Sequence, residues 1–275
     1  MAPLRVGAVI YDPKVSVIWE IIRDFFKSRD CPIDVTFYST YELQVTALLD
    51  GLLDIAWNSP LAWLDAQRRS GGRCRAIAMR DTDRDRASYI VSRTVGPVQT
   101  LADLRGRALA VGARDSPQAT LIPLGLLRRA GLEPGRDVDV RRFDVLVGMH
   151  GDHVGGELEA FRCLQRGEVD ACAVLDLNWH AWTGDGTVDR NEFVAMASTE
   201  PFDHCVFTAG GDLSDETERR WLTALFSMRY DEPKHREMMD LEGLKAWLPG
   251  RTTGFRALSA AIDAERFFED QQSST

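Results

Sequence analysis

Short strand-like runs alternate with amphipathic stretches along residues 4–93, and this alternation constrains the fold more than any other feature of the chain. Runs such as LRVGAVIY and IDVTFYS have the length and the β-branched content of strands, whereas the segments between them repeat with the period of helices. Alternating strands and helices are typical of a sheet whose faces are covered by helices, so we expect an α/β fold. The expected strands are residues 4–11, 33–39, 52–58, 74–80 and 88–93, and the expected helices are residues 16–26, 42–51 and 61–70.

A second α/β unit is expected to begin near TVGPVQTLADLRG, residues 94–106. A chain of 275 residues is long enough for about two domains. Beyond residue 197 two further helices are expected, and they need no sheet of their own, so we expect them to pack back on the first unit. The second unit is expected to contain strands at 107–113, 137–147 and 169–176 and helices at 117–131 and 156–167, and the two late helices are expected at 214–228 and 242–250.

Three strand-to-helix junctions carry strong signals for a helix start. Ser39 and Glu42 have the spacing of a capping box, while Ser59 and Ser116 are each followed by a proline at the first helical position. A helix start presents backbone N–H groups and the positive end of the helix dipole, which together suit a phosphate-like or carboxylate group. In open α/β sheets ligands lie outside the carboxyl ends of the strands, where these junctions fall. Every helix needs a cap, however, so a purely structural role for each junction stays open.

Three longer motifs follow one another in a recognisable order. They are YELQVTALLDGLLDIAWNSPLAW (41–63), SPQATLIPLGLLRRAGLEP (116–134) and LEAFRCLQRGEVDACAVLD (158–176). In this order the chain resembles the phosphonate/phosphite-type solute-binding proteins of ABC transporters, which have the type 2 periplasmic-binding-protein fold. The resemblance covers residues 4–230.

The resemblance implies two α/β lobes with a ligand cleft between them and a hinge at the crossovers. Lobe one would take residues 1–95 plus 198–275, and lobe two residues 96–197. By position, Tyr41, Ser59 and Ser116 fall where that family places ligand contacts, and Asn58 beside Ser59 is a further candidate. This chain departs from the family where Ser116-Pro117-Gln118 replaces Ser-Thr-Ser, so two hydroxyl donors give way to the amide of Gln118.

The stretch VGMHGDHVGGELEAF (147–161) also departs from the family, because it carries two histidines where one is usual. His150 and His153 could donate to a ligand, shape a turn, or serve a metal or a proton transfer, and Glu157 either joins them or complements the helix dipole. A metal site there would need a third ligand such as Asp176, His180 or His204. We expect no metal and no other cofactor. Two side chains at the carboxyl ends of expected strands complete the candidate ligand contacts, and these are Tyr11 and Asp176.

The charge, the cysteines and the hydropathy of the sequence limit which partners and which location we expect. A formal net charge of −9 argues against nonspecific nucleic-acid binding, and no window is apolar enough to insert into a membrane. The start of the chain shows no signal peptide, and its five scattered cysteines suit reduced thiols. We therefore expect a cytoplasmic protein, or an extracytoplasmic one if a leader has been removed.

Two functional hypotheses remain. The favoured one is a binding protein that holds a small polar or anionic ligand in the cleft, with an ABC-transporter permease as partner if the protein is exported. The alternative is a cytosolic enzyme that uses the same cleft, with His153 and Glu157 or Asp176 carrying protons for a small organic substrate.

Overall fold

The structure, a computed structural model, describes residues 2–10, 13–144 and 156–272. Its internal contacts divide the chain into two compact units. Unit 1 consists of Met1–Arg84 and Asp203–Gly254, and unit 2 consists of Asp85–Phe202 and Phe255–Thr275. The chain therefore passes from one unit to the other at 84/85, at 202/203 and again at 254/255.

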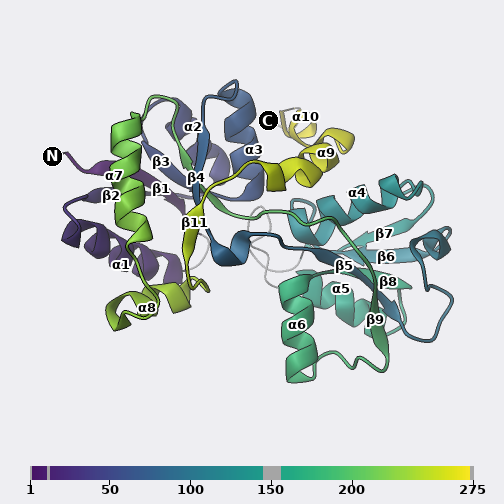
Figure 1. The fold of residues 1–275 in the computed structure, drawn as a ribbon. Coiled ribbons are helices and arrows are strands. Elements are labelled where there is room, and N and C mark those ends of the chain that lie inside the picture. The colour runs from purple at the N-terminus through teal and green to yellow at the C-terminus, as the bar shows by residue number, and fades with distance from the viewer. Residues whose placement is uncertain (1, 11–12, 145–155, 273–275) are drawn as a thin grey trace. The chain divides into compact units, whose positions relative to one another are not determined.

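Unit 1 is built on a six-stranded mixed sheet, shown with its helices in Figure 1. Three parallel strands occupy one side of this sheet, and β10 pairs antiparallel with both β3 and β4. The strand order is β11 (Trp247–Pro249), β4 (Arg75–Arg80), β10 (Val206–Ala209), β3 (Ile55–Asn58), β1 (Leu4–Val9) and β2 (Ile33–Tyr38).

Helices cover both faces of this sheet. One face is closed by α1 (Lys14–Ser28), α7 (Asp215–Phe226) and α8 (Pro233–Leu241), which bury a shared apolar core against the strands. Within that core Phe26 stacks on Trp221 with ring centroids 5.4 Å apart, and Phe207 meets Trp221 edge-on at 4.8 Å. The opposite face carries α2 (Tyr41–Leu49) and α3 (Pro60–Arg69), which pack against each other and against β3. Burial on both faces explains why strands such as β3 read as nearly continuous apolar runs.

Unit 2 is built on a five-stranded mixed sheet with helices on both faces. On one face α5 (Gly156–Gln165) and α6 (Asp176–Asp185) bury Phe161 and Trp179 against the strands. On the other face α4 (Ile122–Arg129) buries Leu124 and Leu127. The strand order is β7 (Asp139–Arg142), β6 (Ala108–Val111), β8 (Ala171–Leu175), β5 (Ser88–Arg93) and β9 (Phe193–Ser198).

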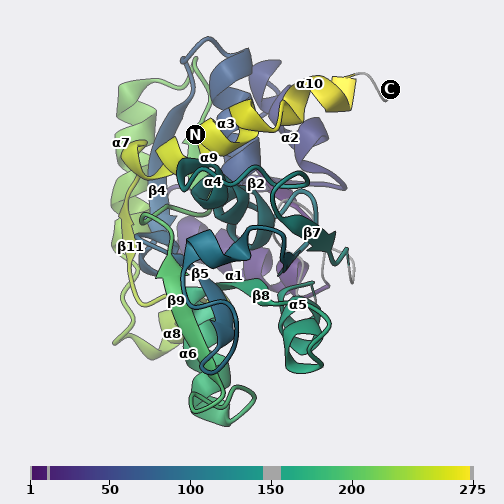
Figure 2. The same ribbon diagram turned by 90° about the vertical axis from the view of Figure 1, so that its right-hand side faces the viewer.

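The C-terminal helices α9 (Arg256–Ala264) and α10 (Phe267–Gln272) belong to unit 2, whereas the sequence analysis placed residues 198–275 in lobe one and expected no helix after residue 250. Figure 2 shows α9 lying beside α4. The two helices pack closely at Gly125, where a Cβ would lie 3.4 Å from the Cβ of Ala261. Arg128 also pairs with Glu265 at 2.6 Å. These contacts explain why the end of the chain returns to unit 2.

The expected helix at 242–250 is wrong. Trp247–Pro249 forms β11, an edge strand that pairs antiparallel with β4. Trp247 is 7% exposed and packs on Phe207 and Trp57, so its packing in the core decides the local structure. The sequence also missed α6, α8, β9 and β10.

The expected α/β class is confirmed, and each of the two units has its own sheet. Within residues 2–10, 13–144 and 156–272, no helix combines the length and the apolar character needed to cross a membrane.

Candidate functional site

In unit 1 the candidate residues gather at one edge of the sheet. Because β1, β2 and β3 are parallel, their carboxyl ends meet at this edge, and α2 and α3 begin there. Tyr41 is the first residue of α2, while Asn58 ends β3 and Ser59 caps α3. The structure therefore brings all three to the same edge. Tyr41 is 2% exposed, and Asn58 and Ser59 are fully buried.

The helix starts at this edge are capped by side chains. Ser59 Oγ accepts from Ala62 N at 3.2 Å, and Pro60 occupies the first helical position, so the predicted cap is confirmed. The predicted cap of α2 at Ser39 is wrong by one residue. Thr40 has the extended backbone of a cap, and its hydroxyl accepts from Leu43 N at 3.3 Å.

A buried chain of hydrogen bonds holds the end of β3 in place. Gln44 Nε2 donates to Asn58 Oδ1 and to the backbone oxygen of Trp57, both at 2.8 Å. Asn58 Nδ2 in turn donates to Thr208 Oγ1 at 3.0 Å. The amide of Asn58 thus joins α2, β3 and β10 inside unit 1. This arrangement indicates that Asn58 positions the Ser59 turn, and its predicted ligand contact stays a prediction.

In unit 2 the candidate residues also lie at one edge of the sheet. Strand β6 runs parallel to β8, and β5 runs antiparallel to β8 and β9. The carboxyl ends of β6, β8 and β9 therefore meet the start of β5. Ser116 and Gln118 follow β6, Asp176 follows β8, and Glu157 lies in the first turn of α5. These four residues come from separate parts of the sequence.

The Ser116 turn is firmly held. Ser116 Oγ accepts from Ala119 N at 3.1 Å, which confirms the predicted cap. Residues Pro117–Leu121 form one π-helical turn that continues directly into α4. Ser88, at the start of β5, donates its hydroxyl proton to the backbone oxygen of Gln118 at 2.5 Å. The turn is therefore tied to the strand beside it, a degree of preorganisation that suits a binding surface.

Glu157 is a buried carboxylate, with 4% of its surface exposed. One of its oxygens accepts from Leu175 N at 2.8 Å and from Asn178 Nδ2 at 2.9 Å. Both donors belong to the β8–α6 junction, so Glu157 holds this junction to the start of α5. Asp176, in the same junction, is only partly buried and lies 3.5 Å from the guanidinium of Arg86. Asp176 is thus the more accessible of the two carboxylates.

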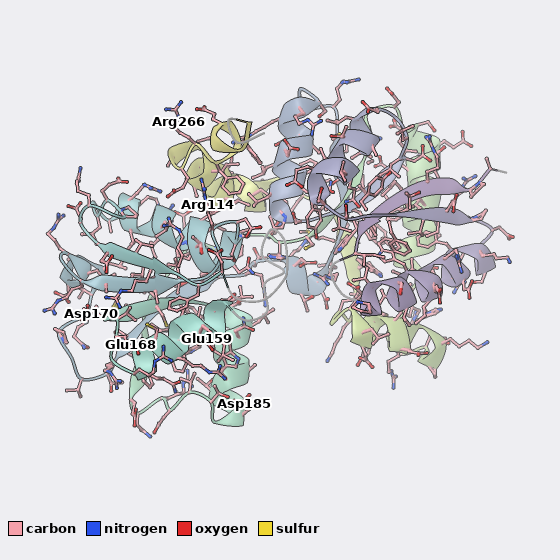
Figure 3. All side chains as sticks on the ribbon, turned by 180° about the vertical axis from the view of Figure 1, so that it is seen from behind. Arg114, Glu159, Glu168, Asp170, Asp185 and Arg266 are labelled. Carbon is pink, nitrogen blue, oxygen red and sulfur yellow. The ribbon has the colours of Figure 1, made fainter. Side chains whose placement is uncertain are left out.

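Positive charge also lies near the Ser116 turn. A cavity of about 300 Å³ in unit 2 is lined by Arg114, Thr120, Leu121, Arg142, Glu265 and Phe267. Figure 3 shows Arg114 near the segment that carries Arg266, whereas the labelled acidic side chains Glu159, Glu168, Asp170 and Asp185 lie away from that segment. The net charge of the chain therefore does not describe the local charge beside this turn.

Three of the predicted contacts, Tyr11, His150 and His153, lie outside the described residues, and their roles stay predictions. The sequence analysis in turn missed Arg86, Ser88 and Thr199, although Thr199 Oγ1 accepts from Ser88 N at 2.9 Å at this same edge. Ser88 and Thr199 flank strands that pair antiparallel from distant parts of the chain. No local motif marks them, and only the pairing of β5 with β9 would have revealed them.

A family model described as "ABC transporter, phosphonate, periplasmic substrate-binding protein" matches residues 14–254. The chain belongs to this family. The resemblance drawn from the three motifs is thereby confirmed, and membership favours a phosphonate-type binding protein over the enzyme hypothesis.

Solved structures and one curated relative are also similar. PhnD1 from Prochlorococcus marinus, solved with methylphosphonate, is 16% identical with a TM-score of 0.66, and the match covers 96% of this chain and 98% of that one. A Xanthomonas citri protein solved with ATP is 18% identical with a TM-score of 0.73 over 97% and 98% of the two chains. At these identities the likeness shows the fold alone, which is the predicted periplasmic-binding-protein fold. An uncharacterized protein of Haemophilus influenzae is 48% identical over 42 residues, which is 15% of this chain and only 56% of that protein.

The expected cytoplasmic location is wrong, because this phosphonate-binding family is periplasmic and points to a place outside the cytoplasm. The argument from cysteines fails for a physical reason. All five cysteines are buried, and none of them forms a disulfide bond. Burial raises the pKa of the Cys74 and Cys172 thiols, which keeps them in the unreactive protonated form. Buried thiols of this kind say nothing about the redox state of the compartment.

Proposed function

We propose that this phosphonate-family protein captures a small organophosphonate, or a closely related phosphorus oxyanion, and delivers it to the permease of an ABC transporter. The observation that carries the proposal is the family match across residues 14–254, a range that includes the candidate edges of both units. The permease is proposed as the partner because proteins of this family serve ABC transporters.

The Ser116 turn is the proposed contact for the phosphonate group. Its π turn leads into α4, so the positive end of the helix dipole lies at the carboxyl edge of the unit 2 sheet. Backbone N–H groups at such an end favour an oxyanion without requiring a lysine or arginine. The bonds that Ser116 and Ser88 make to this turn keep it in one conformation, so little ordering is needed when a ligand binds.

The two carboxylates at the same edge, Glu157 and Asp176, constrain the charge on the rest of the ligand. Glu157 and Asp176 place two carboxylates at this edge, whereas Arg86 brings one guanidinium to Asp176. A second negative charge on the ligand would be repelled there, whereas a neutral or positive substituent would not. We therefore propose a phosphonate whose carbon chain ends in a neutral or cationic group. The amide of Gln118 and the histidines His150 and His153 are the proposed donors that complete the contact.

A panel of four ligands tests this proposal. Methylphosphonate, 2-aminoethylphosphonate, inorganic phosphate and methanesulfonate are each titrated into the purified protein by calorimetry, and the bound ligand is then extracted and analysed. We expect saturable binding of at least one phosphonate, weaker binding of methanesulfonate, and recovery of the phosphonate unchanged. Absence of binding by both phosphonates and by phosphate would overturn the assignment. Chemical conversion of the ligand would instead identify the protein as an enzyme.

A further inference from the structure

Asp83, His204 and Cys205 lie together at the edge of the unit 1 sheet, although 121 residues of sequence separate Asp83 from His204. Asp83 ends a short 3-10 helix, Asp81–Asp83, that follows β4, and His204 and Cys205 directly precede β10. Because β4 and β10 are antiparallel, the end of one strand meets the start of the other. The backbone bond from His204 N to Asp83 O, at 2.8 Å, fixes the two segments side by side. None of the three is among the candidate ligand contacts, and the sequence suggested His204 only as a third ligand for a metal at His150 and His153.

One donor atom from each of these three side chains lies within 4.8 Å of the other two. His204 Nδ1 is 3.1 Å from Cys205 Sγ and 3.6 Å from Asp83 Oδ1. Zinc bonds of about 2.3 Å to sulfur and about 2.0 Å to nitrogen or oxygen would place tetrahedral donors about 3.3 to 3.6 Å apart. The two spacings from His204 lie within about half an ångström of these values, and the oxygen of Asp83 and the sulfur of Cys205, which are within 4.8 Å of each other, would close on the ion as it binds. We propose that Asp83, His204 and Cys205 form a binding site for zinc or a similar divalent transition-metal ion.

The charges around the cluster favour a cation. Arg80 donates to both oxygens of Asp83, at 2.6 and 3.0 Å, and also to Glu242 at 2.8 Å. One guanidinium thus faces two carboxylates, and a metal-bound Cys205 thiolate would add a third negative charge. Arg251 is bound at 2.6 Å to the neighbouring Asp203, so that pair balances itself. A divalent ion would neutralise the excess negative charge at a site where Asp83 is 3% exposed and Cys205 is 3% exposed.

The chemical types of the three donor atoms indicate which metal ion this site would bind. Calcium and magnesium prefer all-oxygen ligands, whereas a thiolate and an imidazole with one carboxylate suit zinc. Three protein ligands leave a fourth tetrahedral position for water or another small donor. The bonds from Arg80 to Asp83 would orient the carboxylate from behind, as outer partners of metal ligands commonly do. Such an ion would cross-link two of the segments through which the chain passes between its units.

Cobalt(II) is a direct probe, because a cobalt–thiolate bond gives an intense near-ultraviolet charge-transfer band. The full-length protein is stripped with a chelator, kept reduced and titrated with Co²⁺, and then with Zn²⁺ as competitor. We expect a thiolate band that saturates at one equivalent and is abolished by zinc. The Cys205→Ser variant should lose the band, and the His204→Ala variant should bind Co²⁺ at least tenfold more weakly. Cys74→Ser, at another buried cysteine of unit 1, should keep the band.

The double variant His150→Ala, His153→Ala separates this site from the histidine pair predicted from the sequence. It should keep the cobalt–thiolate band in full. Failure of the folded wild-type protein to develop a thiolate band would overturn the proposal whatever the variants do, and so would a band that survives Cys205→Ser. As a second measurement, zinc should raise the melting temperature of the wild-type protein but not that of His204→Ala, and an equal rise in both would also contradict the site.

Discussion

Gln44 donates to Asn58 at 2.8 Å inside unit 1, and this bond ties α2 to the end of β3. Both side chains are fully buried, and Asn58 passes the connection on to Thr208. The turn that begins α3 therefore depends on amide groups that never meet solvent. Buried polar chains of this kind contribute little net stability when complete but cost much when one member is removed.

The first prediction concerns Asn58. Asn58→Ala leaves the hydroxyl of Thr208 without this donor and Gln44 with one acceptor fewer, so we expect a loss of about 1–3 kcal/mol in the free energy of unfolding. Urea denaturation followed by circular dichroism measures the loss. Asn191→Ala, at an exposed asparagine, is the control and should change stability by less than about 0.5 kcal/mol. Equal stability of the two variants would show that the buried chain is not needed.

The second prediction separates two glutamates of α5. Glu157→Ala removes the acceptor of Leu175 N and of Asn178 Nδ2, so we expect a loss of about 1–3 kcal/mol. Glu159 lies on the same helix, but its side chain is 28% exposed and pairs with Arg162 at 2.5 Å. Glu159→Ala should therefore cost at most about 0.5 kcal/mol. Thermal unfolding of the two variants measures the difference. Equal melting temperatures would contradict this account of Glu157.

The third prediction is a pH dependence at the turn before β7. Arg136 donates to Asp137 at 3.0 Å and Glu133 N donates at 2.8 Å, and these bonds lower the pKa of Asp137 to about 2 although burial opposes the shift. A carboxylate with a lowered pKa stabilises the folded state above its ordinary value of 3.8, and this contribution is lost as the pH falls toward 2. The Asp137→Asn variant should therefore be less stable than the wild-type protein at pH 7. This difference in stability should shrink as the pH falls below about 4. NMR titration should show Asp137 still ionised at pH 3, and a midpoint near 4 would refute the assignment.

The elements that the sequence predicted well are those whose signal is local. Pro60 and Pro117 after a serine mark helix starts within two residues, and both predicted caps are confirmed. Apolar runs with β-branched residues likewise predicted β2 and β5 to within a residue. These features depend on backbone sterics and hydrogen bonds between near neighbours.

The elements that the sequence missed depend on distant partners. The segment around Trp247 forms an edge strand because Trp247 packs on Phe207 and Trp57. No pattern within residues 242–250 indicates that contact. The role of Glu157 is equally hidden, because its hydrogen-bond donors lie 18 and 21 residues further along the chain. Asp83 and Cys205 likewise meet only through the antiparallel pairing of β4 with β10.

Calorimetric titration of methylphosphonate into the wild-type protein, Ser116→Ala and Ser214→Ala tests the central claim most directly. Ser116 and Ser214 each cap a helix, α4 through its π turn and α7, so both substitutions should cost about 1 kcal/mol of stability. Only Ser116 lies at the proposed phosphonate contact. The account predicts one site per chain in the wild-type protein, at least tenfold weaker binding by Ser116→Ala, and unchanged binding by Ser214→Ala. Equal affinities for all three proteins, or no binding of methylphosphonate by the wild-type protein, would contradict it.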